Sequence, residues 1–251
     1  MAFFFKSTVL DKFDVDYFKC ANCDFVQTED PSWLEGSYSE AITQSDIGII
    51  RRNIMLSKIT SAVINAFFNQ NNKYLDYGGG YGLLVRIMRD MGFDFHWYDQ
   101  FCQNLFAKGF EHNTKDKTQY ELVTAFEVFE HLPNPLEIVD TMISSSKSIL
   151  FTTELMPTKV SPPDTWWYYG QDHGQHISFY TKKTLSIIAR QISLNLYTNG
   201  KSIHLLTTKK ISPVLFNVVS KYKIAALLNS ISRRKSLIET DYKKLTGNSL
   251  S

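Results

Sequence analysis

The stretch YLDYGGGYG at residues 74–82 places four glycines within five positions, directly after a short apolar run. Glycine adopts positive φ angles and lets another group approach the backbone closely. A helical pattern follows at once, with apolar residues at Leu84, Ile87, Met88 and Met91. The free amides that begin such a helix carry positive potential. The stretch therefore predicts a strand-to-helix turn that receives a nucleotide-like ligand, because a packing turn alone needs fewer glycines.

Strand-like and helix-like segments alternate from residue 73 onward. Strand patterns occur at 73–77, 93–99, 120–128 and 148–155, and helical patterns at 83–91, 134–145 and 185–192. This alternation is typical of an open, mainly parallel sheet with helices on both faces. The pair Asn199-Gly200 predicts a hairpin that adds an antiparallel strand. We expect an α/β fold with a Rossmann-like, doubly wound, seven-stranded sheet that binds ligands at the carboxyl ends of its strands.

Three parts of the chain are predicted from these patterns. Residues 1–45 are aromatic and irregular and predict a small N-terminal subdomain. A helical pattern opens at Asp46, where Ile47, Ile50 and Ile54 share one face, and the alternating segments follow it. We therefore expect the main domain at 46–210 and a C-terminal helical extension at 211–251.

The glycine pattern distinguishes between two classes of nucleotide ligand. The dinucleotide fingerprint G-x-G-x-x-G/A needs a small third residue, but that position holds Leu83 or Val85, depending on the starting glycine. An NAD(P)-dependent oxidoreductase on a similar fold is therefore an alternative, but a disfavoured one. The pattern that remains is D-x-G-x-G-x-G, formed by Asp76, Gly78, Gly80 and Gly82.

This spacing resembles motif I of the class I S-adenosylmethionine-dependent methyltransferases, in the branch that acts on sugars and secondary metabolites. The resemblance covers about residues 70–210. It also includes Asp99, AFEVFEHLPNP at 125–135 and GQHISFYTKKTL at 174–185. It implies an enzyme that transfers a methyl group from S-adenosylmethionine to a small-molecule acceptor, a sugar or nucleotide-sugar of polysaccharide or secondary-metabolite synthesis.

The same resemblance implies the residues around the cofactor. The carboxylate of Asp99 would accept hydrogen bonds from the ribose hydroxyls, and the glycine loop would wrap the methionine and ribose. Tyr38 would close over the methyl donor and Arg52 would pair with the cofactor carboxylate. The adenosyl pocket would be lined by Ala125, Phe126 and Glu127.

The pair Glu130-His131 follows the expected adenosyl pocket directly. We expect these two side chains to be mainly structural, in the turn before the next helix.

The acceptor side is predicted in the long connection after residue 154. Aromatic faces can stack on a sugar or ring substrate, which makes Trp166, Trp167 and Tyr168 candidate substrate contacts. A lid packed on the core is the alternative. His173 is a further candidate substrate contact, and the resemblance assigns a histidine at the position of His176. A neutral imidazole is well suited to take the proton of a nucleophilic oxygen, so His176 is the candidate general base. The alternative is a loop-stabilising role.

Composition bounds the other possibilities. A net charge of +2 and the lack of an Asn/Asp-Pro-Pro-Tyr/Phe-type motif disfavour a nucleic-acid substrate. Cys20 and Cys23 have the spacing of half a zinc knuckle, but a second pair is missing, so no metal is expected. Three cysteines and no apolar signal or membrane segment predict a cytoplasmic protein without membrane insertion. A non-catalytic cofactor-binding protein is the second alternative.

Overall fold

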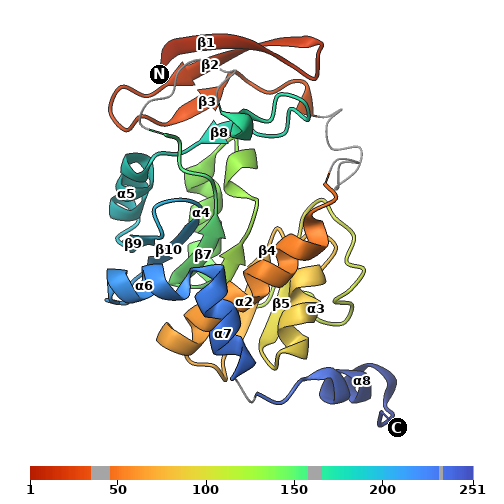
Figure 1. Ribbon diagram of the computed structural model, residues 1–251. Coiled ribbons are helices and arrows are strands. Elements are labelled where there is room, and N and C mark those ends of the chain that lie inside the picture. Colours follow the sequence, from red (N-terminus) through yellow and green to blue (C-terminus); the bar gives the residue numbers. More distant parts are fainter. Residues whose placement is uncertain (35–45, 158–165, 232–233, 251) are drawn as a thin grey trace.

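The computed structural model describes residues 1–34, 46–157, 166–231 and 234–250, which form two sheets and the helices around them (Figure 1). The larger one, the main sheet, has the strand order β5-β4-β6-β7-β10-β9. Its strands are β4 (Lys73–Tyr77), β5 (Asp94–Tyr98), β6 (Leu122–Ala125), β7 (Ser148–Thr152), β9 (Asn195–Thr198) and β10 (Ile203–Thr207). Strands β4 to β7 are parallel, so their carboxyl ends meet at one edge of the sheet.

The hairpin of β9 and β10 supplies the expected antiparallel strand. Strand β10 pairs antiparallel with both β7 and β9. The side-chain oxygen of Asn199 accepts hydrogen bonds from the amides of Lys201, Ser202 and Ile203, and Gly200 has a φ of 79°. Asparagine and glycine favour this turn because the first bonds its own backbone and the second tolerates positive φ.

The expected count of seven strands is not confirmed, since the described residues form six strands in the main sheet. At the outer edge of β5, Glu111 makes a single parallel bridge with Trp97. The sequence HNTKDK at 112–117 is polar and lacks the apolar alternation that a strand needs to pack on a helix layer.

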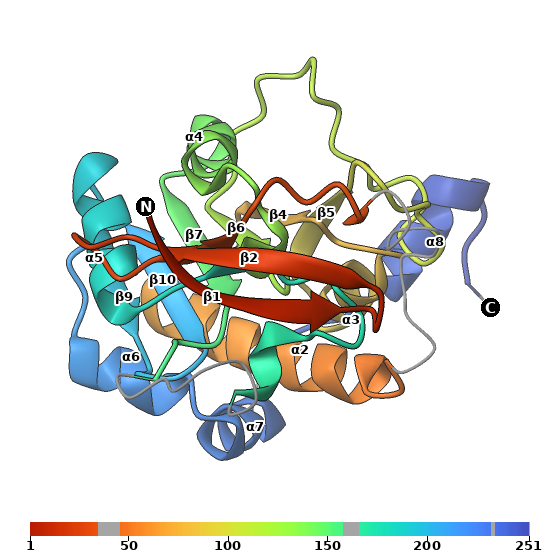
Figure 2. The same ribbon diagram turned by 90° about the horizontal axis from the view of Figure 1, so that it is seen from above.

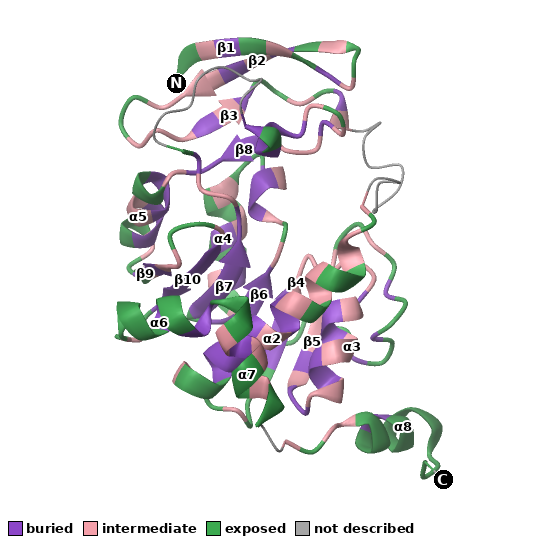
Figure 3. Ribbon diagram, viewed as in Figure 1, coloured by how far each residue is buried: buried purple, intermediate pink, exposed green. Residues whose placement is uncertain are grey.

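Helices cover both faces of the main sheet, as expected. Helices α2 (Ile49–Phe67), α3 (Leu83–Asp90), α6 (Pro213–Val219) and α7 (Tyr222–Ser230) pack on one face, and α4 (Pro135–Ser145) and α5 (Lys182–Gln191) pack on the other. Alternate strand residues serve the two layers: Leu150 faces the first, whereas Ile149 and Phe151 face the second. The strands β4, β6, β7 and β10 are buried along most of their length, whereas the edge strands β5 and β9 are only partly buried (Figure 3).

Helix α8 (Ile238–Thr246) is held against α3 by ion pairs. The buried carboxylate of Asp241 pairs with Arg86 at 2.9 Å and with Arg89 at 2.7 Å, and both arginines belong to α3. No helix in the described part of the chain combines the length and the apolar character that crossing a bilayer requires.

The smaller sheet, the N-terminal sheet, is antiparallel and has the order β1-β2-β3-β8. It contains β1 (Ala2–Val9), β2 (Phe13–Lys19), β3 (Val26–Thr28) and β8 (Ser178–Phe179), so its last strand comes from far along the chain. It lies above the carboxyl edge of the main sheet (Figures 1 and 2). Cys20 and Cys23 are free thiols in the turn after β2. The expected boundary at residue 45 falls in a segment outside the described residues.

Candidate active site

The glycine turn connects β4 to α3 and is tied to the end of β5. The amides of Gly78 and Gly79 donate hydrogen bonds to the carbonyl of Tyr98 at 2.8 and 3.1 Å. Gly78, Gly80 and Gly82 have φ angles of 68°, 53° and 87°, a region that side chains with a Cβ rarely adopt. The conformation of the turn therefore requires glycine at these three positions.

The surroundings of the glycines differ. A Cβ added at Gly78 would lie 2.6 Å from the Val128 side chain, and one at Gly82 would lie 2.8 Å from Asn104. A Cβ added at Gly80 would meet nothing within 4 Å. Close packing of the protein on itself explains Gly78 and Gly82, whereas Gly80 borders open space where a ligand can approach the backbone.

Asp99 stands at the carboxyl end of β5 and faces the same turn. Its Oδ2 accepts a hydrogen bond from the amide of Gly80 at 2.8 Å, and its Oδ1 accepts the amides of Phe101 and Cys102 at 2.8 and 2.9 Å. On the other side, the indole of Trp97 donates to the carbonyl of Gly80 at 2.8 Å. These bonds fix the carboxylate beside the open glycine.

Asp76 lies beneath the glycine turn, inside the main sheet. Its side chain is buried in β4 and accepts a hydrogen bond from the hydroxyl of Thr124 at 2.6 Å. Burial, with a contribution from the charge of Asp99, raises the pKa of Asp76 to about 7. The carboxyl group therefore supports the turn from beneath, and its Oδ2 would lie 2.9 Å from a Cβ added at Gly79.

The residues at the end of β6 border the candidate site beside the glycine turn. Ala125 is fully buried and Phe126 packs against the core layer of α2 and α3. Glu127 has a φ of 54°, unusual for a residue with a side chain. Its amide donates to the hydroxyl of Thr152, and that hydroxyl donates to its carboxylate, both at 2.8 Å. These two hydrogen bonds with Thr152 stabilise the positive φ of Glu127 and fix the position of its carboxylate.

Arg52, in the first turn of α2, faces that carboxylate. Its guanidinium makes two hydrogen bonds with Asp46, at 3.1 and 2.7 Å, and lies 3.9 Å from the carboxylate of Glu127. Tyr38, the other residue predicted to contact the methyl donor, lies outside the described residues.

The aromatic residues of the long connection have unequal positions. Trp166 and Tyr168 are buried in the core of the N-terminal sheet, with Phe5, Tyr17 and other aromatic residues. Trp167 is 76% exposed. Among the described residues of this segment both alternatives occur: Trp166 and Tyr168 pack as core, and Trp167 alone of the three offers a free aromatic face.

A cluster of titratable groups lies where the two sheets meet. One ligand atom each of Glu130, His131 and His176 lies within 4.8 Å of the others. His131 and Glu130 belong to the short 3-10 helix η1 (Phe129–His131), while His176 precedes β8. The amide of Ile177 donates to the carbonyl of Glu130 at 2.8 Å and holds the two segments together.

Each of these two histidines bonds a backbone carbonyl. Nδ1 of His176 donates to Tyr168 at 2.6 Å, and Nδ1 of His131 donates to Gln175 at 2.9 Å. Burial lowers the pKa of His176 well below its usual value and that of His131 to about 4. Both rings are therefore neutral near pH 7 and carry a lone pair on Nε2. His173 packs beside His176, with ring centroids 4.7 Å apart.

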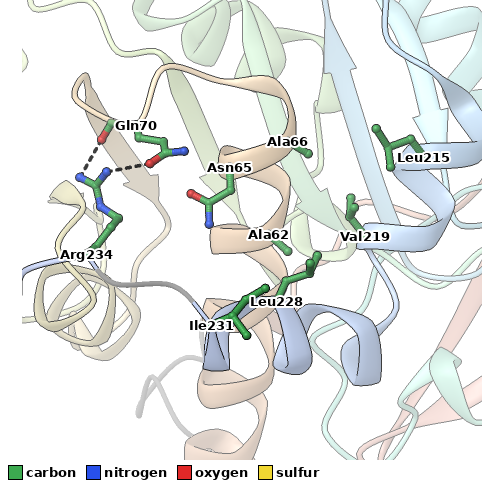
Figure 4. Close-up of a pocket in the computed structure, with 9 residues that line it drawn as sticks. All are labelled: Ala62, Asn65, Ala66, Gln70, Leu215, Val219, Leu228, Ile231 and Arg234. Atoms are coloured by element: carbon green, nitrogen blue, oxygen red, sulfur yellow. Dashed lines mark hydrogen bonds between the residues drawn. The ribbon is translucent and has the colours of Figure 1, made fainter.

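A groove of about 510 Å³ lies elsewhere, between α2 and the C-terminal helices (Figure 4). Its lining comes mostly from the last turns of α2 and from α6 and α7, and Arg234 at its rim is bound to Gln70 at 3.1 Å. The end of α2 leads directly into β4, so the groove lies at the amino edge of the main sheet. It is therefore separate from the glycine turn, which follows β4.

The sequence matches the family model of the methyltransferase domain over residues 51–199, more than half of the chain. The chain belongs to this family. The predicted class of enzyme, an S-adenosylmethionine-dependent methyltransferase, and the predicted cofactor are thereby confirmed at the level of the domain. No curated protein matches the sequence.

Solved methyltransferase structures are similar to this chain, and the one with a TM-score of 0.50 supports the same fold. The plantazolicin methyltransferase in complex with S-adenosylhomocysteine has a TM-score of 0.50 and 11% identity, over 71% of this chain and 95% of that one. A methyltransferase of calicheamicin biosynthesis with S-adenosylhomocysteine bound (TM-score 0.45, 9% identity) and OxaC with sinefungin and meleagrin (0.41, 18%) match 64% and 56% of this chain. The match spans 55% and 44% of those two chains.

Sequence reasoning missed part of the site. Thr152 and Trp97, which hold Glu127 and Gly80, carried no local signal because their partners come from neighbouring strands. Glu130 was expected to be mainly structural, yet its carboxylate is buried and makes no hydrogen bond of standard geometry within the described residues. The signal that would have found it is the adjacency of an acid and a histidine followed by a further histidine in QHISFY.

Proposed function

We propose that this protein transfers the methyl group of S-adenosylmethionine to a small, sugar-like acceptor in polysaccharide or secondary-metabolite synthesis. The observation that carries the proposal is the open side of Gly80 next to the fixed carboxylate of Asp99, at the carboxyl edge of a methyltransferase domain. Ligands of such sheets bind at this edge. The domain division at residues 45 and 210 and the cytoplasmic setting belong to the same proposal, and three free thiols support the cytoplasmic setting.

The cofactor would lie along the ends of β4, β5 and β6. We assign the ribose to Asp99, whose Oδ2 accepts a single amide and retains a lone pair toward the open side. The adenosyl group would contact Ala125, Phe126 and Glu127. Arg52 would exchange part of its pairing with Asp46 for the cofactor carboxylate, a group that a guanidinium binds in two-pronged fashion. The glycines of the turn, with Tyr38, would complete the enclosure.

The acceptor would enter between the two sheets. Trp167 supports this placement, because its exposed ring can stack on the apolar face of a sugar. His173 and His176 line the same connection. In the transfer, an acceptor hydroxyl attacks the methyl carbon in line with the breaking C–S bond, and the sulfonium leaves as a neutral thioether. The hydroxyl proton passes to Nε2 of His176, which is neutral and therefore able to accept it.

Calorimetry with S-adenosylhomocysteine and, separately, with NADH tests the cofactor assignment. We expect binding of the first and none of the second. Saturable binding of NADH alone would establish the oxidoreductase alternative instead, despite Leu83 and Val85.

Transfer of labelled methyl groups to a panel of sugars, nucleotide-sugars and phenolic metabolites tests the acceptor class. We expect turnover with a sugar-containing acceptor, and a loss of kcat in His176→Asn with little change in the affinity for S-adenosylhomocysteine. A protein that binds the cofactor, transfers to none of these acceptors and ignores the His176 substitution would be a non-catalytic cofactor-binding protein.

A further inference from the structure

The strongest unexplained feature of the fold is the carboxylate of Glu130. It is fully buried, and neither oxygen makes a hydrogen bond of standard geometry within the described residues, although the Tyr168 hydroxyl lies close enough to favour the charged form in part. An isolated buried carboxylate is costly, and proteins compensate such a group by pairing it or by having it coordinate a metal. Its charge is unfavourable for a second reason, because the carboxylate of Glu127 lies nearby.

We propose that Glu130, His131 and His176 bind one divalent metal ion between the two sheets. Their ligand atoms lie within 4.8 Å of one another. Ligands about 2.1 Å from a shared ion stand roughly 3 to 3.5 Å apart, so the most distant pair needs to approach by at most about 1.3 to 1.8 Å. Two imidazoles and one carboxylate suit a first-row transition ion such as Mn²⁺, and leave positions open for other ligands.

The hydrogen bonds of the two histidines support metal binding. In each ring Nδ1 donates to a backbone carbonyl, of Gln175 for His131 and of Tyr168 for His176. This is the arrangement that orients a metal-binding imidazole and places its lone pair on Nε2. Metal ligation needs neutral rings, and burial keeps the pKa of both histidines low.

The role of the ion in catalysis rests on the proposed function, whereas its binding does not. An ion with open positions would take the acceptor oxygen as a further ligand and lower the pKa of its hydroxyl. Nε2 of His176 cannot coordinate the ion and accept a proton at the same time, so ion binding would replace the general-base role proposed above for His176, and the acceptor proton would pass to solvent.

The test is titration of the chelator-treated protein with MnCl₂ alone, without any methyl donor, followed by calorimetry and electron paramagnetic resonance. We expect saturable binding of one ion per chain. Mn²⁺ prefers oxygen and imidazole ligands over the thiols of Cys20 and Cys23, so binding reports on the cluster. The absence of saturable binding at millimolar Mn²⁺ overturns the proposal.

Two variants locate the ion. Glu130→Gln keeps the size of the side chain and should weaken Mn²⁺ binding at least tenfold, and His131→Asn should do the same. Glu239→Gln, on the exposed surface of α8, is the matched control and should bind the ion as the wild type does. Equal affinity of Glu130→Gln and wild type overturns the assignment. S-adenosylhomocysteine binding, measured on the same samples, separates the two proposals: its presence without Mn²⁺ binding refutes only the metal site.

Discussion

The carboxylate of Asp99 accepts a hydrogen bond from the amide of Gly80 at 2.8 Å, and so joins the tip of β5 to the one glycine of the turn that borders open space. Two amides from Phe101 and Cys102 hold the other oxygen. The carboxylate is thus fixed before any ligand arrives, which lowers the entropic cost of binding.

Asp99→Ala should weaken the binding of S-adenosylhomocysteine by about 3 kcal/mol or more, because it removes charge-assisted hydrogen bonds of about 1.5 to 3 kcal/mol each to the ribose. Calorimetry measures the change. Asp99→Asn keeps an acceptor oxygen for the backbone amides and should lose less. An unchanged affinity in both variants would rule Asp99 out as the ribose ligand.

Gly80→Ala and Gly78→Ala separate ligand contact from internal packing. The first places a methyl group in open space and costs only the strain of a positive φ, about 1 kcal/mol. It should fold and yet bind S-adenosylhomocysteine poorly. The second drives a methyl group into Val128 and should lower the melting temperature more. Thermal unfolding and calorimetry on both variants give the comparison, and normal cofactor affinity in Gly80→Ala would contradict the assigned site.

Trp167→Ala should raise the KM for the acceptor about tenfold, the loss expected from one aromatic stacking contact, with an unchanged melting temperature. Tyr168→Phe is the control from the same segment. Its ring is buried, so the substitution leaves the stacking surface of Trp167 unchanged and removes a hydroxyl that lies 3.4 Å from Thr153 and close to Glu130. If Trp167→Ala left KM unchanged, the acceptor would not contact this ring.

His204 predicts a loss of stability in acid. Burial lowers its pKa from 6.5 to about 4, while in the unfolded chain it protonates below 6.5. The unfolded state therefore binds more protons, and stability falls as the pH drops from 6.5 toward about 4. At pH 5 the contribution is about 2 kcal/mol. Denaturant unfolding of His204→Gln at pH 7.5 and pH 5 should show a drop smaller by that amount, whereas equal drops would mean that His204 is protonated in the fold.

Asp76 predicts the opposite dependence. Its pKa is raised from 3.8 to about 7, so the folded state binds the proton more tightly than the unfolded chain does. Its stabilising contribution is complete below pH 3.8 and is lost as the pH rises through 7. Asp76→Asn should therefore gain about 4 kcal/mol relative to the wild type between pH 4 and pH 8. Parallel stability curves for the two proteins would contradict this.

Local sequence patterns predicted the turns, because the backbone conformation of a turn depends on residues that are adjacent in the sequence. The turn at Gly78 and the hairpin at Asn199 were found because backbone conformation there depends on residue type. The apolar periodicity of a helix was less informative about which of its residues are buried. Ile47, Ile50 and Ile54 share a face, yet all three are exposed, because α2 first reaches the core at Leu56.

Features that join distant segments were not predictable from one sequence. The pairing of β8 with β3 depends on only two register pairs, Val26 with Phe179 and Gln27 with Ser178. The cluster of Glu130 and His176 likewise depends on a loop that follows another strand. The residues proposed to bind the cofactor follow the consecutive strands β4, β5 and β6, so a sequence pattern can indicate them, whereas the residues proposed to face the acceptor lie where two sheets meet.

Strand β8 connects the N-terminal sheet to the proposed active site. It follows His176 by one residue and forms the edge of the N-terminal sheet, whose aromatic core encloses Tyr168, the residue that orients the His176 ring. Substitutions in β1 to β3 can therefore move His176 and Tyr168, whereas the glycine turn, which is held by β4 and β5, does not depend on the N-terminal sheet.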